Sequence, residues 1–256
     1  MKIQKTSFSN PSFGSNRKKF DVQGHIGTMY DNGQKVTYNS QNIIDTVEPN
    51  NVKKVLVSSL SGLNALGQDT FCSEIESAKE IIAMKGNDNV KLLPLLSCQP
   101  GIAQDTTVAE KLLDKNKFYG LKFHPSNTNK AIKDNFDIYS KYITLAEKKG
   151  LPCVFHSITD GKSDPVEIIK LAEQHPKHPI ILYHIDLASQ PEQMARTIDN
   201  ISSSVKAGKS NLFIDISWLT NLWDNAEQNK NTIKQALKKL GDRKSTRLNS
   251  SHVALS

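Results

Sequence analysis

The sequence predicts an α/β protein, namely a (β/α)8 TIM barrel that lacks its eighth strand. Seven apolar, strand-like runs alternate with amphipathic helical segments along the 256 residues, which is typical of a parallel sheet covered by helices. Three of these runs, FDVQGHIG, LPCVFHS and PIILYHID, carry a histidine at their C-terminal end. In a barrel of parallel strands, these ends meet at one mouth.

Hydrophobic periodicity places the elements in order. The predicted strands cover residues 19–26, 52–60, 90–97, 118–125, a run that starts at Pro152, 179–185 and 211–217. The predicted helices cover residues 41–49, 71–85, 105–115, 131–149, a segment that opens with Asp164 as N-cap and Pro165, 191–207 and 224–240. Gly150 is the predicted C-cap of the longest helix, and Pro94 is unexpected inside a central strand.

The chain divides into three predicted segments. Residues 1–17 form a polar lead-in, residues 18–241 form the barrel, and residues 242–256 form a tail without a strand or helix pattern. The stretch from Asp242 to His252 resembles the in-frame translation of a sequencing adapter, so we expect the tail to be non-native. An eighth strand is expected after Gly241, where the sequence is polar, so the barrel is predicted to be truncated.

Composition narrows the range of partners. The net charge of +7 comes from lysines spread beside glutamates on predicted helix faces, which argues against a nucleic-acid partner. No apolar stretch approaches the ~20 residues needed to cross a bilayer, and the N-terminus has no apolar signal-peptide region. Cys72, Cys98 and Cys153 are unclustered, which favours buried thiols in a reducing compartment. We expect a cytoplasmic protein with a small-molecule substrate and leave a homo-oligomer open.

The alternation of side chains along each strand predicts one polar layer at the mouth, because successive side chains point to opposite faces. The residues predicted to share an inward face are, strand by strand, Asp21 with Gln23 and His25, Lys122 with His124, Val154 with His156, and Leu182 with His184. Imidazoles gathered in this way are suited to binding a metal and to transferring protons. A metal-dependent enzyme is therefore the leading hypothesis.

The segments FDVQGHIG, GLKFHP, LPCVFHS and IILYHID, in this order and spacing, resemble the amidohydrolase superfamily, specifically its amidohydrolase-related (type 2) branch. The resemblance covers residues 18–241 and is strongest over 118–186. It implies a metal-dependent hydrolase on a TIM barrel, with one divalent metal, most simply Zn, although some members are non-oxidative decarboxylases. It also implies that His25 and His156 are metal ligands. His184 would be a further ligand or the residue that positions and deprotonates the metal-bound water.

The resemblance leaves alternatives for four pocket residues. Gln23 stands where the family has the first histidine of His-x-His, so either the metal site is altered or Gln23 contacts substrate. Lys122 is predicted to be catalytic or to bind a substrate carboxylate, with pairing to a buried acid such as Asp21 as the alternative. His124 either contacts substrate or caps its loop. Trp218 either lines the substrate pocket or packs in the core.

Other polar residues receive structural predictions. Asp186 and Asp215 also follow strands, where structural roles are favoured, and no residue takes the part of the family's acidic residue on strand eight. His175 and His178 lie before the strand at 179–185, at the opposite end of the barrel, and are predicted to be exposed loop residues.

The sequence thus predicts a hydrolase that uses metal-activated water to cleave an amide, ester or lactone-type bond of a small molecule. A decarboxylase on the same scaffold and a non-catalytic barrel that has lost its metal are left open. A phosphodiesterase of the TatD-type nuclease branch is disfavoured, because Ser97 and His124 stand where an acidic ligand is expected. Without an eighth strand, this chain alone is expected to be inactive.

Overall fold

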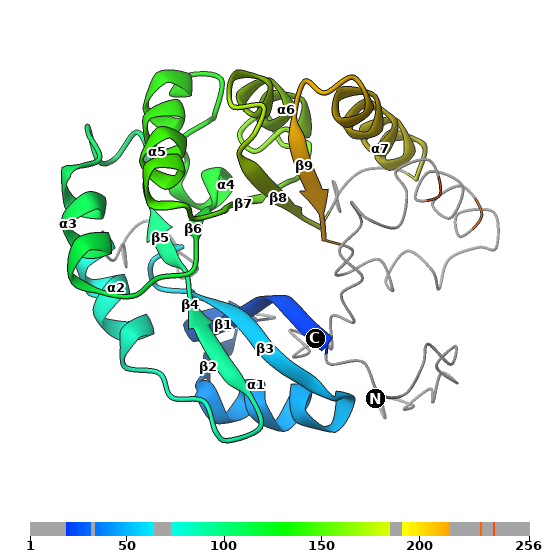
Figure 1. The fold of residues 1–256 in the computed structure, drawn as a ribbon. Helices are drawn as coiled ribbons and strands as arrows, with labels where there is room; N and C mark the ends of the chain where they lie inside the picture. Colours follow the sequence, from blue (N-terminus) through cyan, green and yellow to red (C-terminus); the bar gives the residue numbers. More distant parts are fainter. Residues whose placement is uncertain are drawn as a thin grey trace.

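The computed structural model describes residues 19–31, 34–63, 73–184 and 191–215, together with the single positions 231 and 238. Parallel strands follow one another along a curved inner wall, and the helices lie outside it (Figure 1). The strands form two sheets, one in the order β2-β1-β3-β4 and the other in the order β5-β6-β7-β8-β9. All neighbouring pairs are parallel except β1 with β2.

The predicted alternation of strands and helices is confirmed over the described residues. The strands are β1 (Lys19–Asp31), β2 (Gln34–Tyr38), β3 (Val52–Ser59), β4 (Lys91–Pro94), β5 (Leu96–Cys98), β6 (Leu121–Phe123), β7 (Cys153–His156), β8 (Pro179–Tyr183) and β9 (Asn211–Ile214). The helices are α1 (Ser40–Val47), the 3-10 helix η1 (Glu48–Asn50), α2 (Glu74–Ile82), α3 (Thr107–Lys115), α4 (Pro125–Thr128), α5 (Phe136–Lys149), α6 (Pro165–Gln174) and α7 (Pro191–Lys206). The segments 1–17 and 242–256, and the predicted helix at 224–240 apart from two helical positions, lie outside the described residues.

The third predicted strand is divided at Leu95 into β4 and β5. The Leu95 N–H donates to the Val57 carbonyl on β3 at 2.8 Å, and the Leu96 N–H donates to the Gly120 carbonyl at 3.0 Å. Successive N–H groups thus point to alternate neighbours, so the Pro94 nitrogen points toward β6, which starts only after Gly120. Pro94 therefore removes no hydrogen bond from the sheet, which explains a proline in a central strand.

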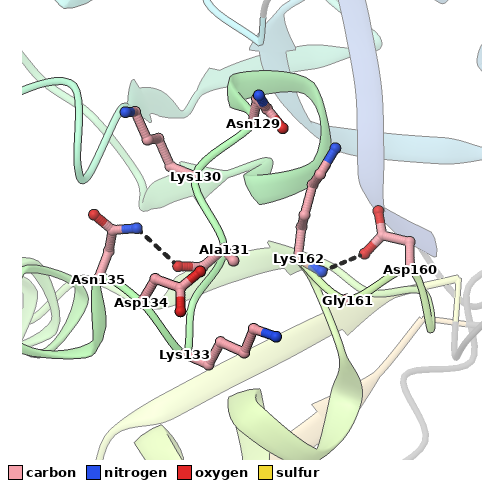
Figure 2. A pocket seen from close by; sticks show the side chains of 9 residues that line it. All are labelled: Asn129, Lys130, Ala131, Lys133, Asp134, Asn135, Asp160, Gly161 and Lys162. Atoms are coloured by element: carbon pink, nitrogen blue, oxygen red, sulfur yellow. Dashed lines mark hydrogen bonds between the residues drawn. The ribbon is translucent and has the colours of Figure 1, made fainter.

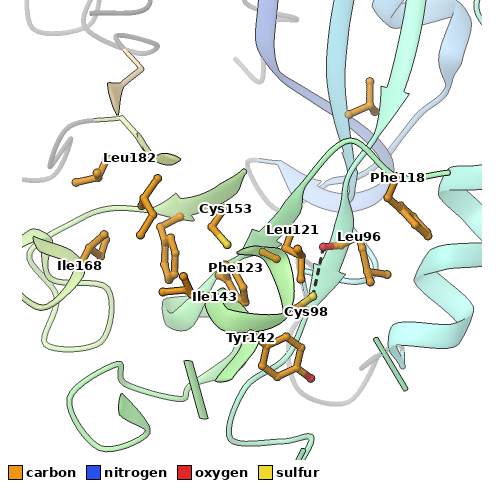
Figure 3. Packing of buried hydrophobic residues seen from close by; sticks show 14 of the residues in the cluster. Leu96, Cys98, Phe118, Leu121, Phe123, Tyr142, Ile143, Cys153, Ile168 and Leu182 are labelled. Atoms are coloured by element: carbon orange, nitrogen blue, oxygen red, sulfur yellow. Dashed lines mark hydrogen bonds between the residues drawn. The ribbon is translucent and has the colours of Figure 1, made fainter. Parts of the chain in front are cut away.

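Two apolar clusters stabilise the barrel, one on each side of its wall. The larger lies between strands and helices, where Phe123, Cys153 and Leu182 pack with Tyr142 and Ile168 (Figure 3). The smaller lies inside the barrel and contains Val22, Leu56, Leu93, Leu95, Val154, Ile181 and Tyr183. The two clusters show which face of each strand points inward.

β1 is longer than predicted and returns as an antiparallel strand, β2. It continues past Ile26 to Asp31, which pairs with Gln34, so two residues connect the strands. These residues are Asn32 and Gly33, a dipeptide that favours two-residue hairpins, so the signal was present in the sequence. The pairing with β2 covers only the part of β1 beyond Ile26.

Two further predictions concern the cysteines and the absence of a membrane-spanning segment. Cys98 and Cys153 are free and buried, as predicted, and burial raises the pKa of both thiols. Cys72 lies outside the described residues. Within the described part of the chain, no helix has both the length and the apolar character needed to cross a membrane.

Candidate active site

Histidines from separate strand ends gather at the C-terminal mouth of the barrel. His156 is the last residue of β7, His124 directly follows β6, and His184 directly follows β8. The rings of His124 and His156 are stacked, with centroids 3.8 Å apart and an interplanar angle of 13°. The centroids of His156 and His184 are 5.2 Å apart. The structure therefore brings together three of the predicted histidines.

His25 on β1 belongs to the same group. Gln23, two residues before His25, contacts His184, and His25 is among the charges that lower the pKa values of His124 and His156. The Nδ1 of His25 lies 2.9 Å from the Ser58 hydroxyl on β3, in agreement with the register that pairs the two residues. This contact leaves Nε2 as the second nitrogen for a ligand or a proton. Ser58 was not predicted as a site residue, although its position beside His25 follows from the strand register.

Gln23 contacts His184 across the mouth. The Gln23 amide Nε2 lies 3.1 Å from His184 Nε2, and because an amide nitrogen only donates, the ring nitrogen accepts. His184 has φ +71°, a left-handed conformation that is uncommon for a residue other than glycine. Gln23 therefore holds the imidazole of a residue whose backbone is itself constrained.

The prediction that His184 shares a regular strand face with Leu182 on β8 is wrong, because the backbone of His184 is left-handed. Leu182 belongs to the outer cluster, whereas Ile181 and Tyr183 belong to the inner one. His184 therefore does not share the face of Leu182 as part of a regular strand. It reaches the mouth because the chain leaves the strand pattern after Tyr183.

The prediction that Asp21 shares a face of β1 with His25 is wrong, because β1 contains a β-bulge. The register with β3 shifts between Asp21 and Gly24, so β1 holds an extra residue there. Val22 packs in the inner cluster, and Asp21 pairs with Val55, whose side chain belongs to the outer cluster. Asp21 therefore does not share a face with His25. Its side chain is buried, and burial raises its pKa to about 7.

Lys122 lies in the barrel interior below the histidines. Its side chain is only 1% exposed, and its Nζ is 3.8 Å from the centroid of the Tyr183 ring. The Tyr183 hydroxyl donates to the Val22 carbonyl, which fixes the ring across the barrel. Burial lowers the pKa of Lys122 well below its usual value, and the charge of buried Asp215 opposes this shift. The acid whose charge acts on Lys122 in this way is Asp215, whereas the alternative prediction named Asp21.

The imidazoles of His25, His124 and His156 are held neutral. The pKa of His25 and that of His156 are lowered to about 3, first by burial and then by the positive charge of Lys122. Burial also lowers the pKa of His124 well below its ordinary value, and His156 adds to this effect. A neutral imidazole is the form that binds a metal or accepts a proton, so these rings are ready for either task near pH 7.

His124 also caps its own loop, as the alternative prediction held. Its Nδ1 accepts a hydrogen bond from the Asn127 N–H at 3.3 Å, at the start of α4. The ring therefore has one nitrogen used by the backbone and one face stacked on His156. Capping and a place in the site are compatible for this residue.

Several predicted residues lie elsewhere. Trp218 and Asp186 fall outside the described residues. His175 and His178 do lie before β8, at the end of the barrel opposite the mouth, but the prediction that they are exposed is wrong. Their exposed fractions are 8% and 5%, because the loop packs against α5, where His175 contacts Ser140.

The ligand types fit a divalent metal, although the described residues alone do not complete a site for one. Neutral imidazoles are zinc ligands, and the 5.2 Å between the His156 and His184 rings is close to the roughly 5 Å expected for two imidazoles on one tetrahedral ion. Over the described ranges, no three His, Cys, Asp or Glu side chains are placed to hold one ion. The Gln23 amide also occupies His184 Nε2. The assignment of His25, His156 and His184 as ligands stays a prediction.

Comparison with known proteins gives no match to a family model and none to a curated protein sequence. Among solved structures, the chain is similar to a probable 2-pyrone-4,6-dicarboxylic acid hydrolase from Acinetobacter baumannii with citric acid bound. That similarity has a TM-score of 0.57 and 13% identity over 90% of this chain and 82% of that one.

Two other solved structures are similar to this chain with slightly lower TM-scores. A dihydroorotase from Campylobacter jejuni has a TM-score of 0.53 and 12% identity, over 89% of this chain and 68% of that one. An HMG-CoA lyase from Brucella melitensis has a TM-score of 0.51 and 13% identity, over 87% of this chain and 77% of that one. All three are TIM barrels, and the hydrolase and the dihydroorotase are of the amidohydrolase type. The chain has a TIM-barrel fold.

Proposed function

We propose that the chain is a metal-dependent hydrolase of the amidohydrolase-related type, which cleaves an amide, ester or lactone-type bond of a small molecule at the barrel mouth. The observation that carries the proposal is the gathering of four histidines from four strands above one buried lysine. The likeness in fold to a hydrolase and a dihydroorotase supports it.

In this proposal His25 and His156 hold the metal, and His184 either completes the site or positions the attacking water. A bound divalent ion, most simply Zn²⁺, would supply a water whose pKa is near 7. Since the Gln23 amide donates to it, His184 Nε2 carries a lone pair, and this nitrogen would accept a proton or bind the metal once the Gln23 amide turns away from it.

The other residues of the proposed site contact the substrate or orient a metal ligand. Lys122 would stabilise negative charge that develops on the cleaved group by donating a hydrogen bond from its Nζ, because its side chain is only 1% exposed and few water molecules compete there. Gln23, His124 and Trp218 are proposed to contact the substrate around that group. Ser58 orients His25 through its Nδ1, so that the other ring nitrogen meets the metal.

Metal analysis of the purified chain tests this proposal independently of turnover. We expect close to one equivalent of zinc after dialysis of the wild type, and a loss of most of it in His156→Asn. His175→Asn is the matched control, since it removes an imidazole at the opposite end. Binding of less than about a tenth of an equivalent by the wild type would contradict the metal site.

An activity screen of the zinc-loaded chain then identifies the bond. Lactones, aryl esters and aryl amides test hydrolysis, and release of carbon dioxide from carboxylated aromatics tests the decarboxylase alternative. Metal binding without hydrolysis of any of these compounds would agree with the expectation that this chain alone is inactive.

A further inference from the structure

A second pocket lies on the mouth side of the barrel, outside the histidine group. It lies between the loop that follows α4 and the loop that follows β7, and its volume is about 470 Å³ (Figure 2). Its walls are polar and hold three lysines; the lining residues are Asn129, Lys130, Ala131, Lys133, Asp134, Asn135, Asp160, Gly161 and Lys162.

The positive charges around this pocket exceed the negative ones, because three lysines share the lining with two carboxylates, Asp134 and Asp160. Within the described residues, no carboxylate lies within ion-pair distance of Lys130, Lys133 or Lys162. The Asp160 carboxylate is used by its own loop, because its Oδ1 accepts hydrogen bonds from the Lys162 and Ser163 N–H groups, each at 2.8 Å. An anion bound in this hollow would therefore meet more positive than negative charge on its walls.

The frame of the pocket is fixed by contacts between the two loops. The Ile132 N–H donates to the Lys162 carbonyl at 2.9 Å, which ties the loop after α4 to the loop after β7. The Ser126 and Ser163 hydroxyls are hydrogen-bonded to each other and join the same two loops a second time. A ligand would therefore meet walls that are already in place, and little ordering would be lost on binding.

The pocket adjoins the proposed active site. His124 and His156 stand at the beginnings of the same two connections that form its walls. Asp160, a lining residue, follows His156 by four positions on the loop after β7. A molecule with its reacting bond at the histidines could thus extend into this pocket.

We propose that the pocket binds a compact anion with at least two negative charges, a phosphate or a polycarboxylate. This inference rests on the proposed function in one respect, since the anion would be the charged end of the substrate. Lysines suit this task, because each ammonium is a point charge that binds phosphate or carboxylate without a fixed geometry. The proposal thereby assigns an anionic class to the substrate.

NMR titration of the full chain with inorganic phosphate, and separately with citrate, at low ionic strength tests the proposal. We expect saturable shifts of amide resonances in residues 129–135 and 160–162. Lys133→Gln and Lys162→Gln should each weaken binding about threefold to tenfold, since each removes one partly solvated charge. Lys148→Gln, at the far end of α5, is the matched control and should leave the affinity unchanged.

Each outcome of this titration decides the proposal. Binding of both anions, or of only one, supports it and identifies the preferred charge group. Shifts that do not saturate below about 50 mM, or an affinity that is unchanged in the Lys133→Gln/Lys162→Gln double variant, would overturn it. The titration needs neither metal nor turnover, so its failure is separate from a failure of the proposed hydrolase.

Discussion

Buried histidines occupy both ends of this barrel, but the two groups are built differently. The mouth group, which consists of His25, His124, His156 and His184, comes from four separate strands, with His25 inside β1 and the others at or directly after a strand end. The opposite group consists of His175 and His178, which come from one short loop before β8. In the mouth group, the ring of His156 contacts the rings of His124 and His184. At the opposite end, the side chain of His175 contacts α5.

The opposite group is explained by packing. His175 Nε2 lies 2.9 Å from the Ser140 hydroxyl, and its Nδ1 lies 3.2 Å from a Glu147 carboxylate oxygen, so both ring nitrogens have partners on α5. Among the described residues, the buried Nε2 of His178 has no hydrogen-bond partner, and burial lowers the pKa of this imidazole. Burial and a lowered pKa thus occur at both ends. What distinguishes the mouth is convergence from several strands, together with a buried lysine below.

The largest expected difference between the two ends is in catalysis. On any substrate that the wild type hydrolyses, His156→Asn should reduce kcat/KM by about 10³-fold, because it removes a proposed metal ligand. His175→Asn should change kcat/KM less than about threefold, because it alters only the packing against α5. Steady-state kinetics on folded protein measures both. Equal losses in the two variants would remove the distinction between the ends.

The next effect concerns metal affinity at the mouth. Gln23→His restores the His-x-His pattern of the resembling family and replaces a neutral amide with an imidazole. Zinc affinity should rise about tenfold or more, because imidazole is the better zinc ligand. Competition with a chromogenic chelator measures the change, and Gln41→His on exposed α1 is the control. An unchanged affinity would show that position 23 does not face the metal.

The smallest expected effect is on stability at the opposite end. His178→Phe replaces a ring that has an unpartnered buried nitrogen, so it should stabilise the fold by about 1 kcal/mol at pH 8. The folded-state pKa of His178 is lowered, so below about pH 6.5 the unfolded chain binds a proton that the folded chain does not. The wild type therefore loses stability from His178 as the pH falls, and the variant should lose less.

Urea unfolding at pH 8 and at pH 5 measures this difference. His175→Phe is the contrasting variant, because it removes the contacts with Ser140 and Glu147 and should destabilise the fold at pH 8. If His178→Phe were as destabilising as His175→Phe, the nitrogen of His178 would have a partner after all.

Much of the fold was predictable because its signals are local. The hydrophobic runs located the strands and the helices between them, and the position of a histidine at the end of a run located the mouth. The predicted caps are also in place: Gly150 ends α5 with φ +65°, and Asp164 precedes α6. The Asp164 side chain, however, accepts hydrogen bonds from the Asp160 and Gly161 N–H groups and none from the helix.

The wrong predictions arose where the tertiary structure interrupts the regular alternation of side chains along a strand. The alternation rule fails for Asp21, because the bulge before Gly24 inserts a residue, and it fails for His184, because the chain leaves the strand with positive φ. Nothing in the sequence indicates that Tyr183 lies under Lys122 or that His175 packs against α5. These placements depend on segments far apart in the chain, which no periodicity within one run reports.

The left-handed backbone of His184 also limits which residues evolution or a mutational library can place there. At φ +71°, glycine, asparagine, aspartate and histidine are accommodated most readily, whereas valine or isoleucine would clash with the backbone. The tolerance of this position is therefore narrow whatever chemistry takes place at the mouth. In a mutational library at this position, a preference for histidine over asparagine would indicate a need for the imidazole. The exclusion of branched residues would indicate only the left-handed backbone.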